Sequence, residues 1–169
     1  TVMEKAREIK SAGEIALMRK SIEVCESAIQ QMREAMKPGI TENALWAELH
    51  HGNIAGGGEW IETRLLSSGP RTNPWFRECS MRPIEKGDMV SFDTDLVGPY
   101  GYCCDMSRSW ICDAEPDDEQ RRLYAAAYEQ IKRNTELLKP GLGYRELTEK
   151  LHPMADEYIP GRYGVAMHG

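Results

Sequence analysis

The 169-residue sequence predicts an α+β fold with two similar halves. Residues 11–36 and 119–138 carry apolar side chains at helical spacing, which predicts two long amphipathic helices. Each is followed by a Lys-Pro-Gly corner, at 37–39 and 139–141, and the second corner leads to a helix pattern at 144–158. Short strand patterns lie between the two helical units. A duplicated α-β half explains this order, and a chance similarity of two helix ends is the alternative.

Local signals bound the elements of the first half. The Pro-Gly pair at 38–39 ends the first long helix, because proline cannot continue a helix and glycine suits the turn after it. Thr41 is expected to cap a second helix over 42–52. A glycine-rich loop at 56–58 and a strand at 60–66 are expected to follow.

The middle of the chain predicts a hairpin. Residues 67–80 have no strong pattern and are expected to form a long loop over the site. A turn at 86–88 leads into a strand at 89–92, and the Gly-Pro-Tyr-Gly turn at 98–101 leads to another strand at 106–112.

Three aspartates in these strands predict a metal site. Asp93 and Asp95 are two positions apart, so on one strand their side chains point to the same side, with Cα atoms roughly 7 Å apart. The hairpin can bring Asp105 across from them. Aspartate is depleted in strands, and converging carboxylates repel one another and lose hydration unless a divalent cation is bound. A solvated acidic turn is the alternative.

His168 supplies a matching type of ligand, in the glycine-flanked apolar segment 162–169. A lone histidine is usually structural, which is the alternative for His168. The other histidines lie in helical or helix-end contexts and are expected to be surface or core residues: His50, His51 and His152.

Composition and charge narrow the class of partner. The formal net charge is −6 and no basic run exists, so neither nucleic acid nor an anionic membrane surface is expected. No apolar run has the length of a membrane-spanning helix, and no signal-peptide pattern opens the chain. Five irregularly spaced cysteines favour reduced thiols in a cytoplasmic protein. Because the chain starts at Thr1 and stops at Gly169, directly after His168, we expect a segment of a longer polypeptide.

Short family-like motifs run through most of the chain. They are Glu14-Ile15 with Met18-Arg19-Lys20, Lys37-Pro38-Gly39 with Thr41-Glu42, Ser68-Gly69 with Asn73-Pro74, Lys86-Gly87-Asp88, Gly101-Tyr102 with Asp105, Ser107-Arg108, and His168-Gly169. Together they resemble the pita-bread superfamily of methionine aminopeptidases, Xaa-Pro aminopeptidases, prolidases and creatinases. The resemblance implies pseudo-two-fold α-β halves around a curved antiparallel sheet, with a dinuclear metal centre held by Asp, His and Glu. Residues 1–169 are then expected to form a partial catalytic domain, without an N-terminal domain and a C-terminal ligand-bearing part.

Two departures argue against ordinary peptide hydrolysis. The peptidases place ten positions between their two metal-binding Asp residues, which from Asp105 selects Thr94, and this chain has Asp on either side of Thr94. The peptidases also carry a substrate-handling His after the Asn-Pro-like turn, where this chain has Trp75.

The Asp-Thr-Asp pattern, the segment 101–108 and the Tyr163…His168-Gly169 end are similar to the bacterial dimethylsulfoniopropionate lyases built on this fold. The resemblance implies that Tyr163 contacts substrate and that four residues bind metal: Asp93, Asp95, Asp105 and His168. It places the remaining Glu and His ligands and the catalytic Asp base beyond Gly169. A homodimer is also expected.

The expected reaction is β-elimination of a small zwitterionic sulfonium substrate to dimethyl sulfide and acrylate. A metal acting as a Lewis acid on the substrate carboxylate stabilises the charge that develops when the α proton leaves. The carboxylate-rich ligand set favours two divalent ions, iron first, with Mn or Zn as alternatives. Tyr163, Trp75 and Tyr100 are candidates for cation–π contact with the sulfonium, and plain loop packing is the alternative for Trp75 and Tyr100.

Two other functions stay open at this stage. One is a metallo-aminopeptidase or Xaa-Pro dipeptidase of the same fold, which uses a metal-bridging hydroxide as its nucleophile. The other is a creatinase-like relative without metal that serves binding or scaffolding.

Overall fold

The computed structural model of the chain describes residues 1–154 and 156–161. Within these ranges the α-helices are α1 (Val2–Glu8), α2 (Ala12–Ala35), α3 (Glu42–Ala55), α4 (Asp118–Glu136) and α5 (Tyr144–Lys150). The strands are β1 (Trp60–Ile61), β2 (Leu66–Ser68), β3 (Met89–Asp93), β4 (Leu96–Val97), β5 (Cys103–Cys104) and β6 (Ser107–Ile111). Short 3-10 helices are η1 (Gly69–Thr72), η2 (Pro99–Gly101) and η3 (Asp156–Gly161).

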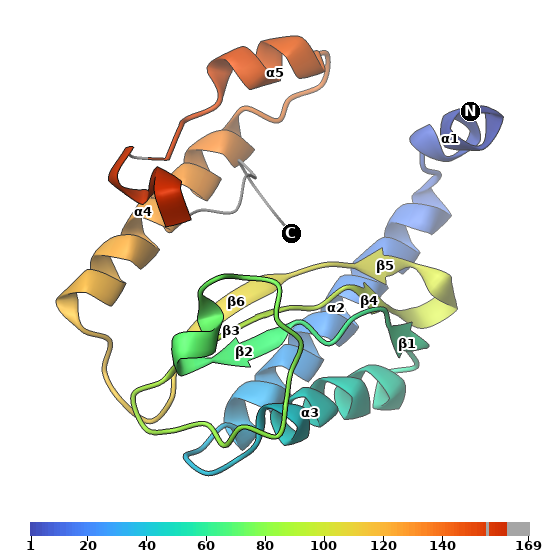
Figure 1. Ribbon diagram of the computed structural model, residues 1–169. Coiled ribbons are helices and arrows are strands. Elements are labelled where there is room, and N and C mark those ends of the chain that lie inside the picture. The colour runs from blue at the N-terminus through green and yellow to red at the C-terminus, as the bar shows by residue number, and fades with distance from the viewer. Residues whose placement is uncertain (155, 162–169) are drawn as a thin grey trace.

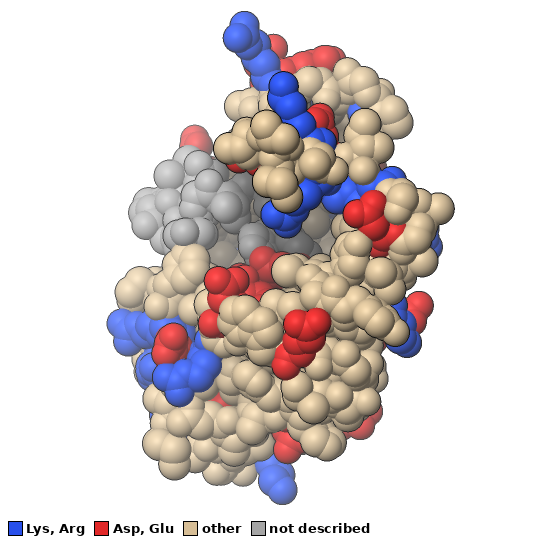
Figure 2. Space-filling view, turned by 90° about the vertical axis from the view of Figure 1, so that its right-hand side faces the viewer, with Lys and Arg blue, Asp and Glu red and all other residues tan. Residues whose placement is uncertain are grey.

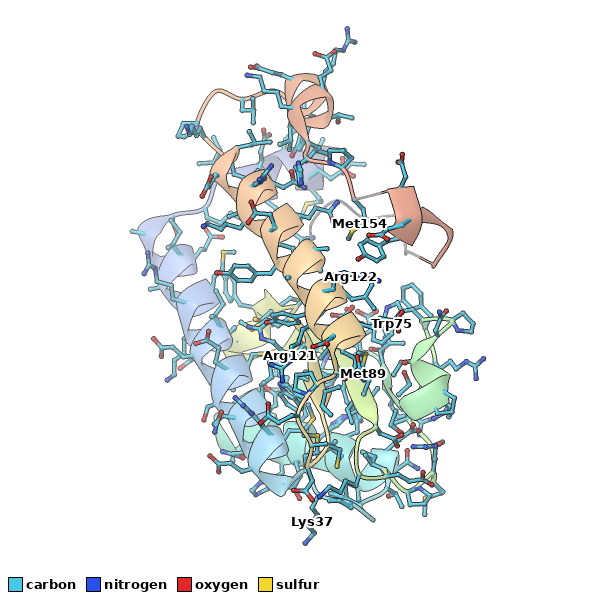
Figure 3. The ribbon with its side chains drawn as sticks, turned by 90° about the vertical axis from the view of Figure 1, so that its left-hand side faces the viewer. Lys37, Trp75, Met89, Arg121, Arg122 and Met154 are labelled. Carbon is cyan, nitrogen blue, oxygen red and sulfur yellow. The ribbon has the colours of Figure 1, made fainter. Side chains whose placement is uncertain are left out.

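The strands form two small antiparallel sheets, in the orders β1-β4-β5 and β2-β3-β6. The sheets are linked because β3 of one leads almost directly into β4 of the other. Helices α2 and α3 lie on one side of the strands (Figure 1, seen from the left in Figure 3). The loop from η1 to β3 starts on the other side, where Figure 3 labels Trp75, and returns to the start of α3, where the Glu42 N–H donates to the Arg82 carbonyl at 3.0 Å.

The core fills the space between the two helices and the strands. Its fully buried apolar side chains come from both layers and include Met32, Leu45, Leu49, Leu66, Val90 and Phe92. The helices approach closely at Gly52, where a Cβ atom would lie 2.6 Å from the Ala28 Cβ. Burial of these side chains, at about 25 cal/mol per Å² of apolar surface, holds the strands against the helical layer.

The expected start of α3 is confirmed, because the Thr41 hydroxyl accepts from the Ala44 N–H at 3.1 Å. Ser11 caps α2 in the same way, with a reciprocal pair of hydrogen bonds to Glu14. Both Lys-Pro-Gly corners contain a glycine in the left-handed region, with φ 92° at Gly39 and 88° at Gly141. The repeated corner therefore has a repeated backbone geometry, for which glycine is the best-suited residue.

Three expected elements differ from those observed. The strand over 60–66 is split, because Ile61 pairs with Leu96 of one sheet and Leu66 pairs with Phe92 of the other. The helix over 144–158 ends at Lys150, since Pro153 disfavours helical backbone in the preceding residue. Helix α3 continues three residues past its expected end, to Ala55, and α1 was not expected at all.

Helices α4 and α5 extend away from the sheets (Figure 1). The amide side chains of Gln130 and Asn134 on α4 are buried and donate to the His152 carbonyl, each at 3.3 Å. These contacts fasten the segment after α5 to α4. None of the helices in the described part of the chain has the length and apolar character needed to cross a membrane.

Candidate metal centre

An acidic cluster lies where the ends of β3, β4, β5 and β6 meet. Asp93, Asp95 and Asp105 each offer a carboxylate oxygen, and these atoms all lie within 4.8 Å of one another. Asp93 is 7% exposed, and the other two aspartates are half-buried. Figure 2 shows acidic side chains gathered near the middle of one face, at the edge of a hollow. The structure thus brings together the three aspartates that the sequence analysis singled out.

The backbone brings Asp95 to Asp93 by a bend rather than by strand alternation. β3 ends at Asp93, β4 begins at Leu96, and Asp95 between them has a φ of 39°, in the left-handed region. The expectation that both aspartates lie on one side of a single strand is wrong in this respect. Asp tolerates the left-handed region better than most residues, because its short polar side chain can form local hydrogen bonds.

Asp105 reaches the cluster from the other arm of the hairpin. It lies between β5 and β6, and its Oδ1 accepts from the Asp95 N–H at 3.4 Å. β3 pairs with β6 so that Asp93 lies opposite Ser107. Asp93 thus lies at the end of a strand, and Asp95 and Asp105 lie in the two short links between the paired strands β3–β6 and β4–β5.

Hydroxyl groups orient two of the carboxylates. The Ser107 hydroxyl donates to Asp93 Oδ1 at 2.9 Å, and the Thr63 hydroxyl donates to Asp95 Oδ2 at 2.8 Å. Carboxylate oxygens held by such partners are ligands that hard divalent cations prefer, whereas three carboxylates at this spacing repel one another without a cation. The residues present therefore fit a divalent metal.

Thr94 lies in the core and not in the cluster. It is fully buried, and its hydroxyl accepts from the Met106 N–H at 2.8 Å and lies 3.5 Å from the Cys104 carbonyl oxygen. The Cys25 thiol of α2 lies 3.7 Å from the Thr94 hydroxyl oxygen. The position that the peptidase spacing selects from Asp105 is therefore filled by a core residue, whose side chain faces the helical layer.

The comparisons with known proteins agree with this geometry. The model of metallopeptidase family M24 matches residues 16–169. The chain belongs to metallopeptidase family M24. Dimethylsulfoniopropionate lyase DddP from Roseovarius nubinhibens is 48% identical over 98% of this chain and 39% of that protein. DddP from Roseobacter denitrificans is 46% identical over 99% of this chain and 39% of that protein. The Xaa-Pro dipeptidase from Pyrococcus furiosus is 29% identical over 97% of this chain.

Solved structures of M24 peptidases share the fold. Prolidase from Pyrococcus furiosus has a TM-score of 0.83 at 28% identity, over 93% of this chain and 46% of that chain. A substrate complex of an Escherichia coli aminopeptidase P variant has a TM-score of 0.79 at 26% identity, over 89% and 34% of the two chains. The expected pita-bread fold is confirmed. M24 is a dinuclear metal-dependent family, and the acidic cluster supplies ligands of the type required.

A buried carboxylate anchors the loop that covers the strands of this M24 chain. Glu42, at the start of α3, is fully buried and accepts hydrogen bonds from the N–H and hydroxyl of Ser68 and of Ser80, at 2.6–3.0 Å. It also pairs with Arg71 of η1. Burial alone would raise the pKa of Glu42, but the hydrogen bonds from Ser80, Ser68 and Arg71 outweigh it and lower the pKa below its ordinary value. Sequence patterns gave no signal for this network.

The two aromatic candidates lie in different surroundings. Trp75 is half-buried on the loop after η1, next to Phe76, with ring centroids 6.2 Å apart. Figure 3 places it on the side of the strands opposite α2. Tyr100 is 79% exposed at the tip of the β4–β5 hairpin, whereas Asp95 and Asp105 flank the base of that hairpin. The hairpin therefore carries Tyr100 away from the cluster.

Two predicted site residues, His168 and Tyr163, lie outside the described residues, so their roles stay predictions. Among the other histidines, His50 is half-buried and packs edge-on against Trp46, and this burial lowers its pKa. All five cysteines are free thiols.

Proposed function

We propose that the protein to which this chain belongs is a metal-dependent lyase that cleaves dimethylsulfoniopropionate to dimethyl sulfide and acrylate by β-elimination. One observation carries the proposal: identity to the two proteins named as this lyase is 46–48%, against 29% for the P. furiosus Xaa-Pro dipeptidase. The chain spans 39% of the length of those two relatives.

The acidic cluster would hold part of a dinuclear centre in this protein. Asp93, Asp95 and Asp105, together with His168, are the proposed ligands, and iron is the proposed metal, with Mn or Zn as alternatives. When bound, the metal supplies Lewis-acid stabilisation of negative charge at the substrate carboxylate.

The chain's own residues bind and orient the substrate in this proposal. Trp75 is the proposed partner of the positively charged sulfonium through a cation–π contact, worth about 0.5–2 kcal/mol. Tyr163 would contact the substrate next to the metal ligand His168. A base, expected beyond Gly169, takes the proton from the carbon next to the carboxylate. The electrons of that C–H bond form the C=C bond of acrylate, and the C–S bond pair leaves with dimethyl sulfide.

The free thiols of all five cysteines support a cytoplasmic location, which we propose together with a bacterial homodimer. The partner class is a small zwitterionic sulfonium compound. Because the formal net charge of the chain is −6, we propose neither nucleic acid nor an anionic membrane surface as a partner.

The test is headspace gas chromatography of dimethyl sulfide from the complete polypeptide, comparing wild type with Asp95→Asn. Asp118→Asn, the same chemical change at an exposed position on α4, is the matched control. We expect dimethyl sulfide from the wild type and the control, and loss of both metal and activity in Asp95→Asn. A wild type that hydrolyses Xaa-Pro dipeptides and releases no dimethyl sulfide would overturn the proposal in favour of the peptidase function.

A further inference from the structure

The linker between β1 and β2 holds Asp95 at two points. The Thr63 hydroxyl donates to Asp95 Oδ2 at 2.8 Å, and the Glu62 N–H donates to the Asp95 carbonyl at 3.0 Å. Thr63 and Asp95 are 32 positions apart in the sequence. The β1–β2 linker, which carries none of the candidate ligands, therefore hydrogen-bonds both the main chain and the side chain of Asp95.

This double contact matches what the backbone of Asp95 requires. Asp95 has a φ of 39°, and a non-glycine residue keeps such a conformation only where its surroundings determine it strongly. The hydrogen bond from Glu62 fixes the carbonyl orientation at the bend. The hydrogen bond from Thr63 fixes the rotation of the carboxylate, and so fixes where its other oxygen, Oδ1, is presented.

The nature of the donor also matters. Two other buried or partly buried carboxylates of the described part, Glu42 and Asp88, are each paired with an arginine, Arg71 and Arg82 respectively. Asp95 receives its side-chain hydrogen bond from a neutral hydroxyl. A neutral donor orients the carboxylate without cancelling its charge, so the whole charge stays available to a cation.

We infer that Thr63 is a positioning residue of the metal centre, which acts through Asp95 and sets the orientation of that carboxylate toward the metal. This inference rests on the proposed function, because it requires that Asp95 bind metal. It assigns a role to the β1–β2 linker, which lies outside the hairpin that carries the aspartates.

The test measures metal affinity and does not depend on turnover. Thr63→Val keeps the size and branching of the side chain and removes the donor, whereas Thr63→Ser keeps the donor. Thr72→Val is the matched control, since the Thr72 hydroxyl donates to the Gly69 carbonyl at 2.9 Å and not to a candidate ligand. Each variant of the complete polypeptide is stripped of metal and titrated with Mn²⁺ alone, and with Fe²⁺ under anaerobic conditions, against a chromophoric chelator.

Thr63→Val is expected to bind metal about 10- to 100-fold more weakly than the wild type, the usual effect of removing a group that orients a ligand. Thr63→Ser and Thr72→Val are expected to stay within a few-fold of the wild type. The melting temperatures of metal-free Thr63→Val and Thr72→Val should fall by similar amounts, which separates positioning from general destabilisation.

Wild-type affinity in Thr63→Val would overturn the inference and leave the proposed function standing, as would an equal loss of affinity in Thr63→Ser. A wild type that binds no metal would instead overturn the metal centre of the proposed function, and the inference with it.

Discussion

Replacing Glu42 with Gln is expected to lower the free energy of unfolding by about 3–5 kcal/mol, the range for removing one partner of a buried ion pair. Glu42 is fully buried and accepts from Ser68, Ser80 and Arg71. Gln keeps the shape, but its NH₂ group would face donors, and Arg71 would lose its counter-charge. The Arg71 side chain is 24% exposed and can recover some hydration, so we expect the lower half of that range.

The loss should depend on pH in a defined direction. The pKa of Glu42 is lowered in the folded protein from an ordinary value of 4.5. The stability that this lowered pKa contributes is fully present above the unfolded-state value and is lost as the pH falls through the folded-state pKa. The difference between wild type and Glu42→Gln should therefore be largest near neutral pH and shrink once the pH falls below about 4.5.

Urea unfolding followed by circular dichroism, at pH 7 and in mild acid, measures both quantities. Glu26→Gln makes the same change at an exposed position of α2 and should alter the free energy of unfolding by less than about 0.5 kcal/mol. A Glu42→Gln protein as stable as this control at pH 7 would refute the reasoning. So would a difference in the free energy of unfolding between wild type and Glu42→Gln that is the same at pH 7 and in mild acid.

Three further predictions follow from other parts of the molecule. Thr94→Asp would place a carboxylate in the core, so it is expected to lower the free energy of unfolding in urea by about 3–5 kcal/mol. It is expected to add neither bound metal nor Xaa-Pro peptidase activity. Higher peptidase activity would contradict the core position of Thr94. Gly98→Ala places a Cβ 2.6 Å from the Ser21 hydroxyl and 3.1 Å from its Cα, and should cost about 1–3 kcal/mol in thermal unfolding, partly restored by Ser21→Gly. Tyr163→Phe is expected to lower dimethyl sulfide production by about 10- to 150-fold at unchanged metal content if its hydroxyl bonds a charged substrate group. Full activity in both Tyr163→Phe and Tyr163→Ala would show that Tyr163 serves only in packing.

Features governed by nearby residues were predictable from the sequence. Ser11 and Thr41 cap their helices through hydrogen bonds to residues three positions on, and the glycines of both Pro-Gly corners adopt the expected turn. The three aspartates were also predicted to converge, because a hairpin with a recognisable turn limits where its arms can lie. In each case the interactions that fix the structure join residues a few positions apart or residues on one pair of strands.

Features governed by distant residues were not predictable. Thr63 lies in a linker without periodicity, and its partner is 32 positions away. The Glu42 carboxylate meets Ser68 and Ser80 at separations of 26 and 38 positions. The left-handed bend at Asp95, which interrupts the strand between β3 and β4, has no sequence signal of its own. Tertiary packing decided all of these positions.

Two buried thiols near the acidic cluster, Cys25 and Cys104, can report how often the structure around the cluster opens. Cys25 and Cys104 are buried, and the Cys25 thiol lies 3.7 Å from the hydroxyl of Thr94, whose neighbours carry the candidate ligands. Because both thiols are buried, their alkylation requires transient separation of α2 from the β4–β5 hairpin. A cation held by Asp95 and Asp105 would stabilise the base of this hairpin and would make such separations rarer. In a Cys103→Ser background, which removes the exposed thiol, the alkylation rate of Cys25 and Cys104, measured separately from that of the buried Cys79 and Cys112, would therefore report how often α2 and the hairpin separate.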